Sequence, residues 1–229
     1  MPNTRDYILI REKEIIKLIE SIKKLGLKYI IVGGYAVATI MKRFSVDLDI
    51  VIKDNEKEKF EEMLKKEGYS IAYSKEISTL YKENFIRFEK TISSLPVSAD
   101  FLINGLVSRT TNASWSFEYI KENSEIRNLE ELSIMVPKKE LLIAMKLHSG
   151  RISDIRDIVA LSKDSSIDLV LKHSKRGDIE KLKKNISNSL EYIKSKNFRD
   201  SFQGVFGIHS HAEELAKNCE EMLKALINS

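Results

Sequence analysis

Two aspartates separated by one residue, Asp47 and Asp49, stand inside an apolar stretch at residues 46–52. Because side chains alternate between the faces of a β-strand, both carboxylates would project from one face while Leu48 packs on the other. Neighbouring like charges repel unless a cation lies between them, which points to a divalent metal ion. Two Mg²⁺ ions about 4 Å apart on such a pair would suit chemistry on phosphate groups. The alternative is an exposed edge strand with two solvated aspartates.

A glycine pair, Gly33-Gly34, follows an apolar run at residues 29–32 and precedes the acid strand. Glycine has no Cβ, so backbone N–H groups at this position could approach a phosphate closely. A helix beginning near Tyr35 would add free N–H donors and the positive end of its dipole. A tight turn alone would explain the same pair, so the glycines need support from other residues.

A third acid, Asp100, lies within an apolar run at residues 97–103. Burying a carboxylate without a partner is very costly, so this side chain requires a cation or hydrogen-bond donors. If its strand lies beside the strand at residues 46–52, Asp100 can complete a metal site. It could also orient the attacking hydroxyl or accept its proton. Taken alone, Asp100 is compatible with a structural role as well.

The motif formed by these residues resembles the signature of the polymerase-β-like nucleotidyltransferase superfamily. It consists of Gly33-Gly34, then Ser45-x-Asp47-x-Asp49, then Asp100 on a later strand. The resemblance implies transfer of a nucleoside monophosphate from an NTP substrate to an acceptor hydroxyl, with two Mg²⁺ ions held by the three aspartates. It implies that the glycines and the Ser45 turn hold the triphosphate. Arg43 could touch the triphosphate too, or be a surface arginine.

The segment after Pro137 resembles the helix pair of AbiEii-type nucleotidyltransferases. Four residues stand at the positions of that family's Lys, Arg and Lys-Asp-x-x-Asp pattern, with Ser153 replacing a basic residue: Lys146, Arg151, Asp154 and Asp157. The resemblance implies that Lys146 reaches the nucleotide phosphates and that one of the acids supports catalysis. A lysine that extends its charge to solvent, and an ordinary ion-pair cluster of the acids with nearby arginines, are the alternatives.

The AbiEii resemblance also implies a toxin-like activity, with tRNA as an acceptor and an antitoxin protein as a partner. A protein side chain or a small molecule such as an aminoglycoside could be the acceptor instead. From a different class, the chain could be a catalytically silent protein that binds nucleotide or a partner. A basic nucleic-acid-binding module is disfavoured by the near balance of 38 basic and 34 acidic residues.

Composition bounds the class of protein. The 229 residues include 42% hydrophobic and 31% charged residues, which is ordinary for a soluble chain. No apolar run approaches the roughly 20 residues that span a bilayer, and no membrane partner is expected. Cys219 is the single cysteine, so no disulfide can form within the chain. These features predict a cytoplasmic protein.

The pattern of apolar residues predicts an α+β fold. A small mixed β-sheet core with flanking helices, residues 1–136, would be followed by a helical C-terminal domain, residues 137–229. Pro137 is expected in the first turn of a helix. The expected helices are 8–25, 35–41, one capped by Asp54 or Asn55 and ending at 66, 179–193 and 212–227. The expected strands are 29–32, 46–52, 69–73, 79–81, 85–90 and 97–102, with weaker candidates at 115–120 and 133–136.

Overall fold

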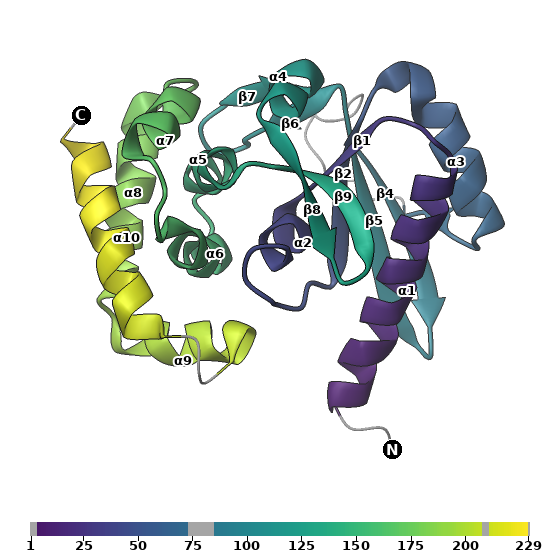
Figure 1. Ribbon diagram of the computed structural model, residues 1–229, viewed down its shortest axis with the longest axis horizontal. Helices are drawn as coiled ribbons and strands as arrows, with labels where there is room; N and C mark the ends of the chain where they lie inside the picture. Colours follow the sequence, from purple (N-terminus) through teal and green to yellow (C-terminus); the bar gives the residue numbers. More distant parts are fainter. Residues whose placement is uncertain (1–3, 73–84, 208–210, 229) are drawn as a thin grey trace. The chain divides into compact units, whose positions relative to one another are not determined.

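The computed structural model describes residues 4–72, 85–207 and 211–228 (Figure 1). The chain forms two compact units. The first comprises Met1–Ala36, Phe44–Leu106 and Ser116–Val136, and the second comprises Val37–Arg43, Val107–Trp115 and Pro137–Ser229. Among the residues that the structure describes, no helix is both long and apolar enough to cross a bilayer.

A five-stranded mixed sheet forms the centre of the first unit, with the strand order β1-β2-β5-β4-β3. The central pair, β2 and β5, is parallel, whereas β1–β2, β4–β5 and β3–β4 are antiparallel. This architecture confirms the expected mixed sheet. The strands are β1 (Tyr29–Val32), β2 (Asp47–Ile52), β3 (Ser70–Ile71), β4 (Phe85–Ile92) and β5 (Leu95–Ile103).

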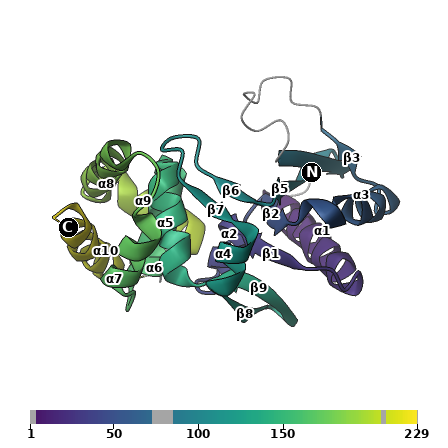
Figure 2. The same cartoon turned by 90° about the horizontal axis from the view of Figure 1, so that it is seen from above.

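One face of the sheet is apolar and covered by helices. Helices α1 (Thr4–Lys24) and α3 (Lys57–Lys66) contact each other, and α1 also contacts β5 (Figures 1 and 2). Phe60 of α3 packs on Phe101 of β5, with ring centroids 5.6 Å apart, and Phe88 of β4 meets the same ring edge-on at 5.5 Å. Because residues alternate along each strand, the neighbours of Phe101 point to the opposite face.

The second unit is helical, as the C-terminal pattern predicts. Helix α5 lies at its centre: every residue from Glu140 to His148 is buried, and α5 contacts α6, α7 and α8. The sequence predicts the bounds of α8 and α10 correctly. The helices are α5 (Lys139–Ser149), α6 (Ile152–Ser162), α7 (Ile167–Ser174), α8 (Ile179–Ile193), α9 (Lys196–Phe206) and α10 (Ala212–Ile227).

Short elements complete the chain. Helix α2 (Gly33–Ala38) follows β1, a 3₁₀ turn at Asp54–Glu56 precedes α3, and α4 spans Phe117–Glu122. Two hairpin-like pairs lie outside the main sheet. They are β6 (Gly105–Val107) with β7 (Ser114–Ser116), and β8 (Ser124–Leu129) with β9 (Leu132–Pro137).

Several local predictions are wrong. The weak strand candidate at residues 115–120 is mostly helix α4, because the Ser116 side chain accepts a hydrogen bond from the backbone N–H of Tyr119 and so caps a helix there. Pro137 ends β9 rather than starting a helix. The expected side-chain cap before α3 is absent, since its N-cap is Glu56 with no side-chain hydrogen bond.

The start of α2 and the presence of strand β8 also differ from the expected elements. Helix α2 begins at Gly33 instead of Tyr35, so the glycine pair forms its first turn. Strand β8 has no counterpart among the expected elements. The expected strand at residues 79–81 lies outside the described residues.

The Phe60–Phe101–Phe88 cluster should dominate the stability of the first unit. We expect Phe101→Ala to lower the free energy of unfolding by about 3–5 kcal/mol, because it removes a fully buried ring and leaves a cavity. Ile126→Ala is the matched control: Ile126 is 71% exposed, and its loss should cost less than about 0.5 kcal/mol. Urea unfolding of both variants checks the difference, and equal costs would contradict it.

Candidate functional site

The three predicted acids lie on one face of the central parallel strand pair. In the β2–β5 register, Asp49 is the Cα partner of Asp100, and Asp47 is the partner of Ser98. Paired residues in a sheet point to the same face, so all three carboxylates project from the face opposite Phe101. We call Asp47, Asp49 and Asp100 the acid face. The structure therefore places Asp100 on the strand next to the Asp47/Asp49 strand, as the metal-site hypothesis requires.

Gly33 makes room for the carboxylate of Asp49. A Cβ built at Gly33 would lie 1.9 Å from Asp49 Oδ2, a distance that no side chain can tolerate. The φ angle of Gly33 is +65°, a left-handed conformation that also favours glycine. The glycine pair thus begins α2 in close contact with the acid face. Gly34 is the second residue of the same helix.

Ser45 shapes the turn that leads into the acid strand. Its hydroxyl donates to the backbone carbonyl of Asp47 at 3.2 Å, and its own carbonyl accepts a hydrogen bond from the Tyr35 hydroxyl at 3.0 Å. Tyr35 is fully buried in α2. These bonds tie the start of β2 to the glycine helix, so the predicted Ser45 position belongs to the same local structure as Gly33 and Asp47.

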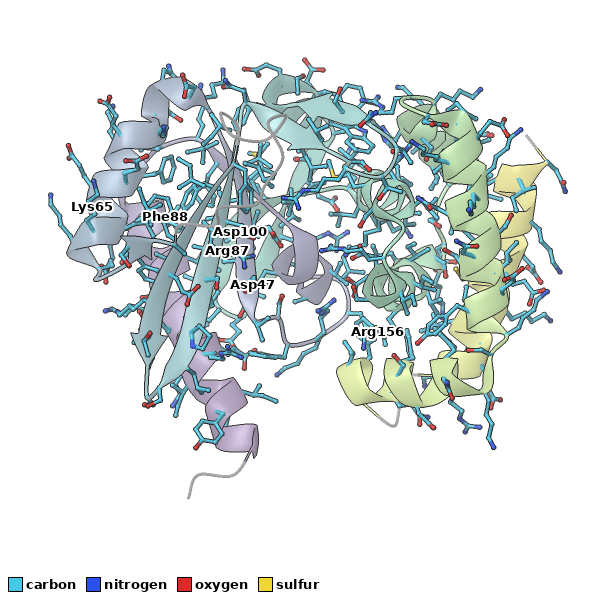
Figure 3. All side chains as sticks on the ribbon, turned by 180° about the vertical axis from the view of Figure 1, so that it is seen from behind. Asp47, Lys65, Arg87, Phe88, Asp100 and Arg156 are labelled. Atoms are coloured by element: carbon cyan, nitrogen blue, oxygen red, sulfur yellow. The ribbon has the colours of Figure 1, made fainter. Side chains whose placement is uncertain are left out.

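Arg87 of β4 forms a bidentate ion pair with Asp100. Its Nε donates to Asp100 Oδ1 and its Nη2 donates to Asp100 Oδ2, both at 2.7 Å. Arg87 is also the Cα partner of Asp100 in the β4–β5 register, so the two side chains share a face. Asp47, Arg87 and Asp100 are labelled in Figure 3, where they lie near one another on the sheet. Asp100 thus has the cationic partner that a carboxylate buried in an apolar strand requires.

The surroundings of the acid face shift the pKa values of two residues, Asp47 and Arg87. Burial, with the nearby charge of Asp100 as a second cause, raises the pKa of the Asp47 carboxyl above its ordinary value. A hydrogen bond from Ser98 and the charge of Arg87 act in the opposite direction without cancelling the rise. The pKa of Arg87 is raised, chiefly by its hydrogen bonds to Asp100, so it stays charged at any physiological pH.

The donor set of the acid face suits a divalent metal ion. Mg²⁺ prefers carboxylate oxygens, and the three aspartates present theirs on one face. The guanidinium of Arg87 already offsets part of their negative charge. Within residues 4–72, 85–207 and 211–228, no group of three or more potential ligand side chains is arranged to hold a metal. Both oxygens of Asp100 accept hydrogen bonds from Arg87.

The remaining predicted residues form a second cluster around Lys146, within the second unit. Lys146 Nζ contacts Asp154 Oδ1 at 3.0 Å and Asp157 Oδ2 at 2.6 Å. Arg43 pairs with Asp157, and Arg151 Nε donates to Asp154 Oδ2 at 2.7 Å. We call these five residues the Lys146 cluster. The sequence separates Arg43 from the others by about a hundred positions, yet the fold brings it to Asp157.

Charge pairing, rather than solvent, stabilises the ions of the Lys146 cluster. Burial alone would raise the pKa of Asp154, but attraction to Lys146 and the hydrogen bond from Arg151 hold it below its ordinary value. Burial alone would lower the pKa of Lys146, yet Asp154 and Asp157 together keep it raised. Arg151 is the member that reaches solvent, with a side chain 71% exposed, against 8% for Lys146.

The structure therefore collects the predicted residues into two groups, each within one unit. The first holds Gly33, Gly34, Ser45, Asp47, Asp49 and Asp100; the second holds Arg43, Lys146, Arg151, Asp154 and Asp157. The sequence reasoning missed Arg87. The sequence did indicate that the buried Asp100 required a cationic partner, but the strand at residues 85–90 carries three charged residues and does not single out Arg87.

Gly33 should tolerate substitution less well than a glycine of similar backbone geometry. We expect Gly33→Ala to cost about 2–4 kcal/mol of unfolding free energy, because its Cβ must displace the Asp49 carboxylate. Gly26 has a φ of +67° with nothing within 4 Å of a built Cβ, so Gly26→Ala should pay only about 1 kcal/mol for the backbone. Chemical unfolding of both variants tests this; a cost at Gly33 no larger than at Gly26 would refute the close contact.

The Lys146 cluster should make stability depend on pH in the acid range. Because the folded-state pKa of Asp154 is depressed, its contribution is complete above its unfolded pKa of about 4 and is lost as pH falls toward the folded value. We expect Asp154→Asn to flatten the loss of unfolding free energy between pH 5 and about pH 2, while lowering stability at pH 7. Asp200→Asn, an exposed carboxylate of α9, is the control. Unchanged slopes in Asp154→Asn would contradict the pairing.

Sequence comparison identifies one family model along part of the chain. The model, described as aminoglycoside-2''-adenylyltransferase, matches residues 14–93. That stretch is 80 of the 229 residues and contains Gly33, Asp47, Asp49 and Arg87, but ends before Asp100. No curated protein matches the sequence.

Solved structures similar to this one include several nucleotidyltransferases. A protein from H. pylori described as a nucleotidyltransferase has a TM-score of 0.54 at 14% identity, over 97% of this chain and 95% of that chain. The lincosamide antibiotic adenylyltransferase LnuA, bound to lincomycin, has a TM-score of 0.48 at 20% identity, over 67% of this chain and 98% of its own. The matched family model and the H. pylori structure are both described as nucleotidyltransferases or adenylyltransferases. The likeness to the H. pylori protein shows that the chain shares that protein's fold.

Proposed function

We propose that the protein is a metal-dependent nucleotidyltransferase that moves a nucleoside monophosphate from an NTP to an acceptor hydroxyl. The observation that carries this proposal is the acid face, with Asp49 and Asp100 in register on the central parallel strands of a nucleotidyltransferase fold. The family match over residues 14–93 adds support, because that family transfers adenylyl groups by its description. An adenylyl group is therefore the first candidate for transfer.

In the proposed reaction, the acceptor oxygen bonds to the α-phosphorus and the bond from that phosphorus to the β-phosphate oxygen breaks. Pyrophosphate leaves, and the acceptor proton passes to a base. Asp47 and Asp49 would hold Mg²⁺, which supplies charge neutralisation at the phosphates when bound. Asp100 would join them as a metal ligand and would orient the acceptor hydroxyl or take its proton. The backbone of Gly33 and Gly34 begins α2 without a Cβ to block a phosphate.

Within the Lys146 cluster of the second unit, Arg151 is the member that a ligand could reach. Lys146 itself already bonds to two carboxylates, in keeping with the ion-pair alternative for this cluster. Arg151 carries a charge that reaches solvent, so within this cluster we assign anion binding to Arg151 and a positioning role to Lys146. Asp154 would then fix the guanidinium of Arg151 through the 2.7 Å and 3.2 Å hydrogen bonds it accepts.

Two acceptors have support. The family match favours an aminoglycoside hydroxyl. The charge of the second unit favours a polyanion, because its three segments contain 20 basic and 13 acidic residues, a net charge of +7, while the first unit carries −3. A polycationic aminoglycoside would be repelled by that excess, whereas RNA would be attracted. A tRNA acceptor, as in an AbiEii-type toxin neutralised by an antitoxin protein, is therefore the second candidate.

Label transfer tests the reaction and separates the acceptors. The protein is incubated with Mg²⁺ and each labelled NTP, together with total tRNA, an aminoglycoside mixture or a protein extract. We expect label on one acceptor class, and a loss of about 100-fold or more in Asp47→Asn, because the metal ligand is removed. Glu125→Gln, which changes a surface carboxylate of β8, should keep full activity.

The opposite result would favour a silent nucleotide-binding protein. If no acceptor is labelled and the wild type matches Asp47→Asn, the transferase proposal fails. Calorimetric titration with Mg²⁺-ATP would then show binding without turnover.

A further inference from the structure

The guanidinium of Arg87 bonds to both oxygens of Asp100, the atoms that a metal ion would use. Both carboxylate oxygens of Asp100 accept hydrogen bonds from Arg87 at 2.7 Å, so a metal ion would compete with the guanidinium for this carboxylate. The Asp100 side chain is only 8% exposed, which leaves little room for a second cation beside the first. We therefore expect a metal ion that uses Asp100 to weaken or displace its pairing with Arg87.

Arg87 is placed to find a new anion when it leaves Asp100. Its side chain is 38% exposed, unlike the buried carboxylate that it holds. It also lies in the electrostatic field of Asp47 and Asp49, on the face that would receive the triphosphate. A guanidinium can bind two phosphate oxygens in the same bidentate way in which it binds a carboxylate.

Resting on the proposed function, we propose that Arg87 is a positioning residue that couples metal binding to nucleotide binding by exchanging partners. In the free protein Arg87 balances Asp100. When metal and nucleotide arrive together, Asp100 turns to the metal ion and Arg87 turns to the phosphates. No charge is left unpaired in either state, so the exchange is favourable only when both ligands are present. Either ligand alone would leave Arg87 or Asp100 without its partner.

Thermodynamic coupling of this kind is reciprocal and can be measured without turnover. Mn²⁺ serves as the probe, with its affinity determined by electron paramagnetic resonance in the presence and absence of α,β-methylene-ATP and corrected for the free Mn²⁺–analogue complex. In the wild type, Mn²⁺ alone should bind weakly, and the analogue should tighten it by about tenfold or more.

Arg87→Gln removes the competing cation. We expect this variant to bind Mn²⁺ alone about tenfold more tightly than the wild type, and to lose most of the gain from the analogue. Arg87→Lys, which keeps one cationic contact, should fall between the two and guards against a folding defect in Arg87→Gln. Lys90→Gln is the matched control. It removes a cation from the same strand, but Lys90 pairs with Glu14 at 2.6 Å instead of Asp100.

The outcomes separate this inference from the proposed function. If Mn²⁺ binding depends on Asp47 but is the same in Arg87→Gln, Arg87→Lys and Lys90→Gln, the exchange is overturned while the metal site stands. Weaker Mn²⁺ binding in both Arg87 variants would also overturn it, since a purely structural arginine predicts that result. If Asp47→Asn binds Mn²⁺ and analogue as the wild type does, the proposed function falls, and the exchange falls with it.

Discussion

The ion pair between Arg87 and Asp100 is the interaction on which the acid face depends. Three carboxylates on two adjacent strands would repel one another in a sheet whose other face is packed with aromatic rings. A bidentate guanidinium offsets one of those charges, satisfies both oxygens of the most buried acid, and arises from the strand next to it. The sheet can therefore keep a concentration of negative charge at its centre without a bound ion.

The second unit also pairs its buried charges, in this case between helices. There a lysine at the centre of a buried helix is matched by two aspartates on the next helix, and each aspartate is shared with an arginine. Breaking one partner of such a group leaves an uncompensated buried charge, which is far more costly than replacing the whole group by apolar residues. The charges of each group are thus paired within the protein. A charged ligand that binds there must replace one of these ion-pair partners or be added beside it.

Much of this arrangement could be predicted from sequence. The period-two pattern around Asp47 and Asp49 indicated a strand with both acids on one face, and the apolar run around Asp100 indicated a partner strand. The helices α8 and α10 followed from their periodicity. Local pattern could not reveal Arg87 as the partner of Asp100, because that depends on which strands pair and in what register. It also could not place α4, where one Ser116 hydrogen bond outweighed the strand-like residues around Trp115. The contact between Arg43 and Asp157 is likewise a property of the folded chain.

The hairpin of β4 and β5 has a consequence for how the chain assembles. Its strands are joined by a two-residue loop, Ser93-Ser94, in which both residues have positive φ angles, as tight hairpin turns require. Arg87 and Asp100 face each other across this local unit, only 13 residues apart, whereas Asp49 is 51 residues from Asp100. Short loops close before long ones. Asp100, the most buried acid, can therefore be paired with Arg87 before β2 joins β5. The repulsion among the three acids is then already reduced when the slower parallel pairing occurs.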